Sequence, residues 1–144
     1  MRRSLFPAVL ILSLLALSLT AVAASLRQIA IIDVPGRPGF NSVAFVNGAL
    51  LISHRGTDTV DIFDTTKRRL IATVKDLDGP EGVAASDKTN RAYIANANDD
   101  TVTVLSTKDW KVEEQIQLND SPYALALSPD GQPEAAEARC TVVP

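Results

Sequence analysis

The chain has 144 residues, of which 46% are hydrophobic and 22% charged, proportions of a globular protein that exclude a wholly disordered chain. Its formal net charge is −3 and it contains no basic run, which excludes nucleic acid as a partner on electrostatic grounds. The chain has one cysteine, Cys140, and one histidine, His54. This count excludes an internal disulfide framework, a redox pair of cysteines, a four-cysteine zinc site and a multi-histidine metal centre.

The N-terminal segment, residues 1–24, is typical of an export signal. Two arginines precede an uncharged, leucine-rich stretch, after which Ala21-Val22-Ala23 supplies the small residues that signal peptidase requires. We therefore expect residues 1–24 to be a helical signal peptide and the protein to be exported to the periplasm, the cell surface or the extracellular medium. The alternative is an uncleaved anchor, because the stretch is long enough to cross a bilayer. The membrane would then be contacted only through this leader.

Beyond the leader, the sequence is typical of short β-strands. Val60 and Ile62 alternate with polar Asp61, and no segment between residues 25 and 131 keeps the 3.6-residue apolar period of a helix. Turn residues such as Asn47-Gly48 separate the alternating segments. We expect strands over residues 27–34, 42–46, 49–53, 59–64, 69–74, 82–85, 91–95, 101–106, 112–118 and 124–128.

The sequence also repeats itself when it is shifted by about 42 positions. With this shift Asp58-Thr59-Val60 falls on Asp100-Thr101-Val102, and the other identical pairs are Ile52 with Ile94, Thr65 with Thr107, Asp78 with Asp120, Pro80 with Pro122, Ala84 with Ala126, and Ser86 with Ser128. These are nine identities over residues 50–86, whereas chance would give about two or three. Four short strands per unit, at a period of about 40 residues, indicate β-propeller blades.

The second repeat unit contains three short motifs. They are Pro80-Glu81-Gly82-Val83-Ala84, Arg91-Ala92-Tyr93-Ile94-Ala95-Asn96 and Asp100-Thr101-Val102-Thr103-Val104, and Tyr123 to Gly131 opens a further unit. In this wording the repeat resembles the YVTN-type β-propeller family, whose members are secreted or surface proteins. The resemblance implies an all-β fold. We expect a partial β-propeller over residues 25–131, with blades at about 40–77 and 80–119 and the start of a third at 122–131.

The repeat pattern is expected to stop after Gly131, so that residues 132–144 form a tail outside it. Pro133 suits the first position of a short helix over Glu134–Arg139, although so short a helix is marginal alone. Closed propellers have at least four blades. Three explanations follow: a truncated piece of a longer propeller, which we favour; a ring of several copies that associate through open blade edges; or a small β protein that is stable as it stands.

Loops at one face of the predicted blades carry the candidate ligand-binding residues. They are His54, Arg55, Glu81, Asn98, Asp99, Asp100 and Tyr123. The oxygen atoms of this set would suit calcium, but the Asp-x-Asp-x-Asp-Gly spacing of a calcium loop is absent from the sequence. Asn and Asp also close turns without any metal. We therefore expect no cofactor, with calcium as the alternative.

His54 is the only imidazole available as a general base. A Ser-His-Asp triad would need it together with Ser53 or Ser42 and with Asp58. Neighbouring residues of a strand point to opposite faces, so Ser53 and His54 would diverge. We therefore assign no catalytic residue.

Two functions follow from this sequence. The first is a non-catalytic exported repeat protein that binds a protein or a cell-envelope partner. The alternative is a metal-dependent lactonase, because Gly79-Pro80-Glu81-Gly82 is similar to the Glu-Gly-Pro wording of the gluconolactonase family. The lactonase resemblance implies metal ligands drawn from several blades around a central channel.

Overall fold

The computed structural model describes residues 28, 31, 33, 34 and 36–136, and this part of the chain is all-β. The expected signal peptide and residues 137–144 lie outside the described residues. One 3₁₀ turn, η1 (Arg55–Thr57), interrupts the strands. No helix of the described residues has the length and apolar character needed to cross a membrane. The strands are β1 (Phe40–Val46), β2 (Ala49–His54), β3 (Thr59–Asp64), β4 (Arg69–Val74), β5 (Pro80–Ser86), β6 (Arg91–Asn96), β7 (Thr101–Ser106), β8 (Val112–Gln117), β9 (Ala124–Leu127) and β10 (Pro133–Ala136).

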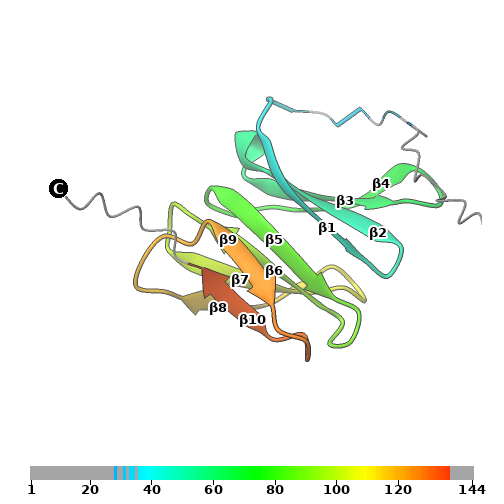
Figure 1. Ribbon diagram of the computed structural model, residues 1–144. Helices are drawn as coiled ribbons and strands as arrows, with labels where there is room; N and C mark the ends of the chain where they lie inside the picture. The colour runs from blue at the N-terminus through cyan, green and yellow to red at the C-terminus, as the bar shows by residue number, and fades with distance from the viewer. Residues whose placement is uncertain (1–27, 29–30, 32, 35, 137–144) are drawn as a thin grey trace, which may run out of the picture.

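The strands form three antiparallel sheets in chain order. The first sheet has the order β1-β2-β3-β4 and the second the order β5-β6-β7-β8, while the third pairs β9 with β10. The first strands of the three sheets, β1, β5 and β9, lie side by side, and each sheet extends away from them (Figure 1). We call these three the inner strands. The two four-stranded sheets confirm the expected fold class.

The sequence repeat is also a repeat of backbone conformation. The ladder between the first two strands is interrupted between Phe40 and Val43 in the first sheet, and between Pro80 and Val83 in the second. Left-handed backbone recurs at equivalent turn positions, in Asp58 and Asp100 (φ 55° and 57°) and in Arg68 and Trp110 (φ 54° and 59°). Asp tolerates this conformation, which explains why it recurs before β3 and β7.

Apolar side chains fill the spaces between successive sheets. The larger core joins the first and second sheets, and its members include Leu51, Ile62, Ile94 and Leu105, each with no exposed surface. A smaller core joins the second and third sheets and is made of Tyr93, Val102 and Val104, against which Ile116, Leu118, Leu125 and Leu127 pack. Tyr93 and Val104 occupy the repeat positions of Leu51 and Ile62. Each sheet therefore offers the same face to the sheet that follows it.

One segment differs from the sequence prediction, and another lies mostly outside the described residues. Residues 133–136 form β10, antiparallel to β9, where the sequence predicted a tail and permitted a short helix from Glu134. The edge of β9 offers unpaired backbone N–H and C=O groups, and β10 forms hydrogen bonds with them. A helix as short as the one expected is marginal alone, so the strand pairing is favoured. The strand expected over residues 27–34 lies mostly outside the described residues, and the four described positions there are not in a strand.

Candidate functional site

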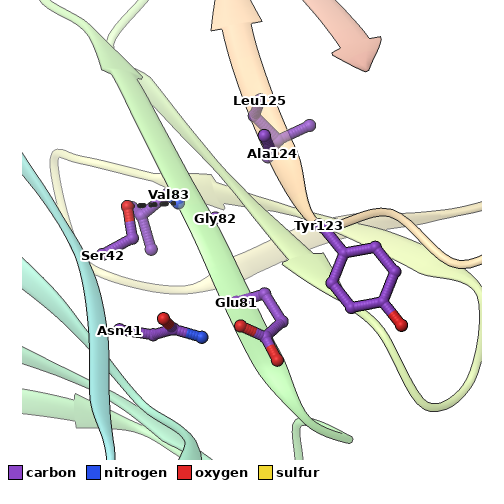
Figure 2. Close-up of a pocket in the computed structure, with 8 residues that line it drawn as sticks. All are labelled: Asn41, Ser42, Glu81, Gly82, Val83, Tyr123, Ala124 and Leu125. Atoms are coloured by element: carbon purple, nitrogen blue, oxygen red, sulfur yellow. Dashed lines mark hydrogen bonds between the residues drawn. The ribbon is translucent and has the colours of Figure 1, made fainter. Parts of the chain in front are cut away.

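A hollow of about 230 Å³ lies where the three inner strands meet. Its lining comes only from them: Asn41 and Ser42 from β1; Glu81, Gly82 and Val83 from β5; and Tyr123, Ala124 and Leu125 at and just before β9. Figure 2 shows the Glu81 carboxylate between Asn41 and the Tyr123 ring. The hollow therefore takes polar side chains from β1, from β5 and from the residue directly before β9. A second hollow, of about 340 Å³, lies at the opposite rim and contains none of the residues predicted from the sequence.

Asn41, Glu81 and Tyr123 occupy one and the same position of the repeat. Asn41 and Glu81 each fall in the interruption of the ladder, directly after Phe40 or Pro80. Tyr123 follows Pro122, the repeat partner of Pro80. The interrupted ladder frees Asn41 and Glu81 from regular pairing, so their side chains reach the hollow.

A chain of polar contacts extends from the hollow across the strand ends. Arg55 Nη1 donates to Glu81 Oε1 at 2.5 Å, and Arg55 Nη2 donates to Asn98 Oδ1 at 3.5 Å. Asn98 Nδ2 in turn donates to Asp78 Oδ1 at 2.9 Å. The Glu81 side chain is 8% exposed and that of Arg55 48%. The carboxylate is therefore fixed by a guanidinium whose other side faces solvent.

Small side chains let the inner strands approach one another. A Cβ on Gly82 would lie 2.9 Å from the Tyr123 carbonyl oxygen and 3.0 Å from Ala124 Cα, so only glycine fits there without a shift. On the other side of β5, the Val83 N–H donates to Ser42 Oγ at 3.3 Å. Ser53 Oγ donates to the Glu81 carbonyl at 2.6 Å. These contacts hold the walls of the hollow in register.

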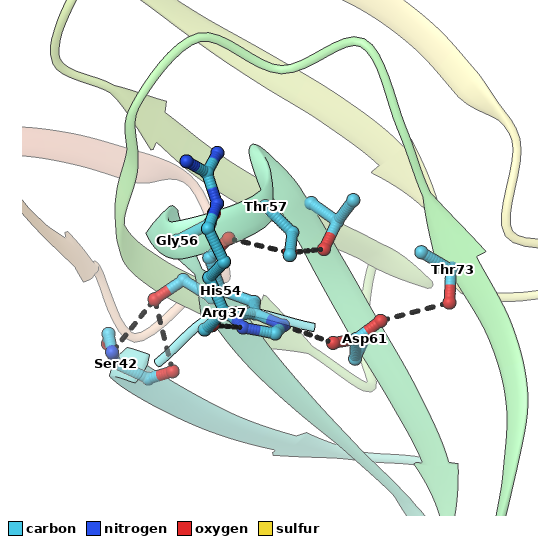
Figure 3. Close-up of polar contacts among 9 residues, drawn as sticks. Arg37, Ser42, His54, Gly56, Thr57, Asp61 and Thr73 are labelled. Atoms are coloured by element: carbon cyan, nitrogen blue, oxygen red, sulfur yellow. Dashed lines mark hydrogen bonds and ion pairs between the residues drawn. The ribbon is translucent and has the colours of Figure 1, made fainter. Parts of the chain in front are cut away.

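His54 belongs to a separate, buried network. Its side chain is 1% exposed, its Nδ1 lies 2.9 Å from Asp61 Oδ2, and its Nε2 lies 2.6 Å from the Arg37 carbonyl oxygen. Thr73 Oγ1 donates to the other oxygen of Asp61 at 2.9 Å (Figure 3). Each ring nitrogen lies against an oxygen atom of another residue, so the ring is held on both sides. His54 therefore anchors the segment before β1 and does not reach the hollow.

The second sheet holds an uncharged version of this network. Asn96, Thr103 and Gln115 are the repeat partners of His54, Asp61 and Thr73. Asn96 Nδ2 donates to Thr103 Oγ1 at 2.8 Å, and Gln115 Nε2 donates to the same oxygen at 3.5 Å. The position is thus a structural tie between the second, third and fourth strands of both four-stranded sheets.

Asp99 and Asp100 lie in the turn between β6 and β7 and accept hydrogen bonds there. Asp99 Oδ1 accepts from Thr101 Oγ1 at 2.8 Å, and the carbonyls of both aspartates accept from Gln117 Nε2. Among the residues that the structure describes, no three His, Cys, Asp or Glu side chains group closely enough to hold a metal ion. Of the seven residues predicted from the sequence, the structure brings Arg55, Glu81, Asn98 and Tyr123 to the hollow or its polar chain.

The sequence prediction did not include Asn41. The signal for it was present, since Asn41 precedes Ser42-Val43-Ala44 as Glu81 precedes Gly82-Val83-Ala84. The step along the chain from Asn41 to Glu81 is shorter than the step from Asp58 to Asp100, so one fixed shift does not align both pairs.

No protein-family model matches the chain, so the YVTN resemblance stays a prediction. Among solved structures, a chain of Kuenenia stuttgartiensis hydrazine synthase matches with a TM-score of 0.67 and 23% identity, over 81% of this chain and 34% of that one. The β-propeller domain of Cps50 (Swd1) from Myceliophteria thermophila matches with a TM-score of 0.57 and 18% identity, over 67% and 32%. The fold is that of β-propeller blades. The first and second sheets are two whole blades, and the third sheet contributes two strands of another.

A curated relative is similar in sequence. Antigen Lp49 of Leptospira interrogans serogroup Icterohaemorrhagiae serovar copenhageni is 30% identical over 81 residues, or 54% of this chain. The match spans 17% of the length of that antigen. The chain spans about a third of each matched propeller chain, with 34% for the first and 32% for the second.

Proposed function

We propose that the protein is an exported, non-catalytic β-propeller module that binds a protein or cell-envelope partner. Its binding surface would be the inner rim, which we define as Asn41, Arg55, Glu81, Asn98 and Tyr123. The proposed export is supported by the leader sequence, and by the description of the leptospiral relative as an antigen. The blades would work within a larger ring, because closed propellers have at least four.

One observation carries this proposal. Positions that shape the blades keep their character from repeat to repeat, as Val43 and Val83 do, whereas the position at the hollow changes from Asn41 to Glu81 to Tyr123. The fold does not require these three different polar side chains, since Asn41 and Glu81 fall in the same ladder interruption and Tyr123 occupies the equivalent repeat position. Side-chain variety on a repeated scaffold is what a binding surface needs.

The chemistry of the inner rim suits recognition. Tyr123 is 52% exposed, and Tyr and Arg are among the residue types enriched at the energetically important positions of protein interfaces. Arg55 holds the Glu81 carboxylate in place before a partner arrives, so little order would be lost on binding. The surface offers a carboxylate, a guanidinium, amides and a phenol ring, which together fit a polar partner with one flat apolar group.

The test measures binding of the purified exported chain to isolated cell envelopes of the producing organism. We expect saturable binding that Tyr123→Ala and Arg55→Ala each weaken about tenfold or more, as for central interface residues. Val112→Ala is the control, because Val112 is 49% exposed on the outer strand β8. Equal binding by Tyr123→Ala and the wild-type chain would contradict the proposal, as would calcium-dependent hydrolysis of gluconolactone.

A further inference from the structure

An apolar face of the first blade is open to solvent. Val43 and Phe45 on β1 are 63% and 62% exposed, and Phe40 at the start of the strand is 53% exposed. Val43 and Phe45 are directed away from the second blade, because Ser42, Ala44 and Val46 alternate with them and face it. Large apolar side chains gathered on one strand face in this way mark an interaction surface.

The second blade shows what covers such a face. Val83 pairs with Ile94 as Val43 pairs with Ile52, so the two valines are equivalent. Val83 is 7% exposed, because it packs in the core between the first and second blades. In the third sheet, Leu125 and Leu127 hold the same repeat places and pack on the second blade. The faces of β5 and β9 that are equivalent to the open face of β1 therefore each pack against the preceding sheet.

The complementary face is open at the other end of the chain. On β9, Ala124 and Ala126 are exposed and alternate with the packed Leu125 and Leu127. Ala126 is the repeat partner of Ala84 and corresponds to Ala44, which packs against the first core. Ala124 and Ala126 are thus exposed on the side of β9 that corresponds to the side on which β1 packs against the next blade.

We propose that a second copy of the chain docks head to tail, with its β9 face of Ala124 and Ala126 against the β1 face of Val43 and Phe45. The two faces belong to opposite sides of one molecule, so the contact is heterologous and repeats from copy to copy, giving a ring where the rotation between copies closes. No charged residue lies among these four. The interface reproduces the contact between successive blades within the chain, which explains why a copy fits better than an unrelated partner.

The experiment measures the mass of the exported chain in solution by sedimentation velocity over a range of concentrations. We expect concentration-dependent association of the wild-type chain. Val43→Lys/Phe45→Lys and, separately, Ala126→Lys should each reduce it to monomer, because a lysine ammonium cannot be buried in the contact without large cost. Val112→Lys, at a similarly exposed apolar position, should associate like the wild type. Circular dichroism of each variant checks that it is folded.

A mixture of the two monomeric variants decides the geometry. Each retains one intact face, so the mixture should give a one-to-one complex and nothing larger. A wild-type chain that is monomeric at every concentration would overturn the proposal. So would association that survives the Val43→Lys/Phe45→Lys change, or association that this change abolishes while Ala126→Lys leaves it intact, which would indicate two β1 faces in contact.

Discussion

At the scale of single residues, His54 and Asp61 form a buried polar pair inside the first blade. His54 is 1% exposed and Asp61 4%, and both ring nitrogens as well as both carboxylate oxygens have partners. The second blade places the neutral Asn96 and Thr103 at the same positions. The fold therefore accepts either an imidazole–carboxylate pair or an amide–hydroxyl pair as this tie, provided that both members match.

The first prediction concerns exchange of this tie. Asp61→Thr alone should destabilise the protein by about 3 kcal/mol, because it leaves the His54 imidazole buried without its carboxylate. The double variant His54→Asn/Asp61→Thr recreates the pair of the second blade and should recover part of the loss, with a coupling energy of about 1–3 kcal/mol. Urea unfolding of the wild type, both single variants and the double variant measures this. If the destabilisation of the double variant equals the sum of the two single destabilisations, the predicted coupling between His54 and Asp61 is absent.

At the scale of strands and turns, the approach of β5 to β9 depends on Gly82. Its substitution by alanine would place a Cβ 2.9 Å from the Tyr123 carbonyl oxygen, a backbone atom that cannot turn aside. We expect Gly82→Ala to destabilise the protein by about 1–3 kcal/mol, the usual cost of overpacking. Ala124→Ser, an exposed change at the equivalent repeat position, should stay within about 0.5 kcal/mol of the wild type. Equal urea midpoints for the two variants would refute the predicted clash.

The turn between β3 and β4 gives the stability a defined pH dependence. Asp64 Oδ1 accepts the backbone N–H groups of Thr66 and Lys67 at 2.9 and 2.8 Å, and Lys67 Nζ lies 3.1 Å from the other oxygen. The hydrogen bond from the Lys67 backbone, aided by the Lys67 side chain, lowers the pKa of Asp64 below its ordinary value. A lowered folded-state pKa contributes stability above the ordinary carboxyl pKa, and this stability is lost as the pH falls through the lowered value.

Asp64→Asn should therefore be less stable than the wild type near neutral pH, and the difference should vanish in acid below the lowered pKa. Urea midpoints measured from about pH 2 to pH 7 test this, since the ordinary pKa of Asp is about 4. Lys67→Met is the matched control. It should keep most of the pH dependence, because the backbone N–H of residue 67 makes the largest contribution. A difference between wild type and Asp64→Asn that is constant with pH would count against this account.

The strands could be predicted from the sequence because alternation and turn chemistry recur at fixed spacing. Val60 and Ile62 alternate about Asp61, and the structure has β3 there. The β10 pairing was not predicted, because Pro133-Glu134-Ala135-Ala136 carries no strand pattern and the exposed ladder of β9 supplies its partner. Local sequence is a weak guide where a neighbouring edge decides the conformation.

The candidate site was predictable only in part. Arg55, Glu81 and Tyr123 were found because loop position marks them, whereas burial of His54 depends on the Arg37 carbonyl and the Asp61 carboxylate, which lie 17 and 7 residues away in sequence. Nothing in the sequence near His54 distinguishes a buried ring from a solvated one. The convergence of Asn41 with Glu81 required the packing of β1 on β5.

At the scale of the whole molecule, the inner rim depends on the stacking of three sheets. Tyr123 stands directly before β9, and the third sheet is held by a smaller core than the one between the first two blades. In repeat architectures each unit contacts only its neighbours, so stability is a sum of local contributions. Opening of the third sheet alone would remove Tyr123 from the hollow and leave Arg55 and Glu81 in place.

The last prediction follows from the difference in size between the two cores. Amide hydrogen exchange should be faster in β9 than in β6 and β7, because local opening draws on the region with the fewest buried contacts. Leu125→Ala should speed exchange in β9 without changing that in β2 and β3, since Leu125 packs only in the smaller core. Leu51→Ala is the contrasting variant, because Leu51 has no exposed surface and lies in the larger core. It should cost about 2–5 kcal/mol and speed exchange in both whole blades. Uniform exchange across β2, β6 and β9 in the wild type would show instead that the three sheets open as one cooperative unit.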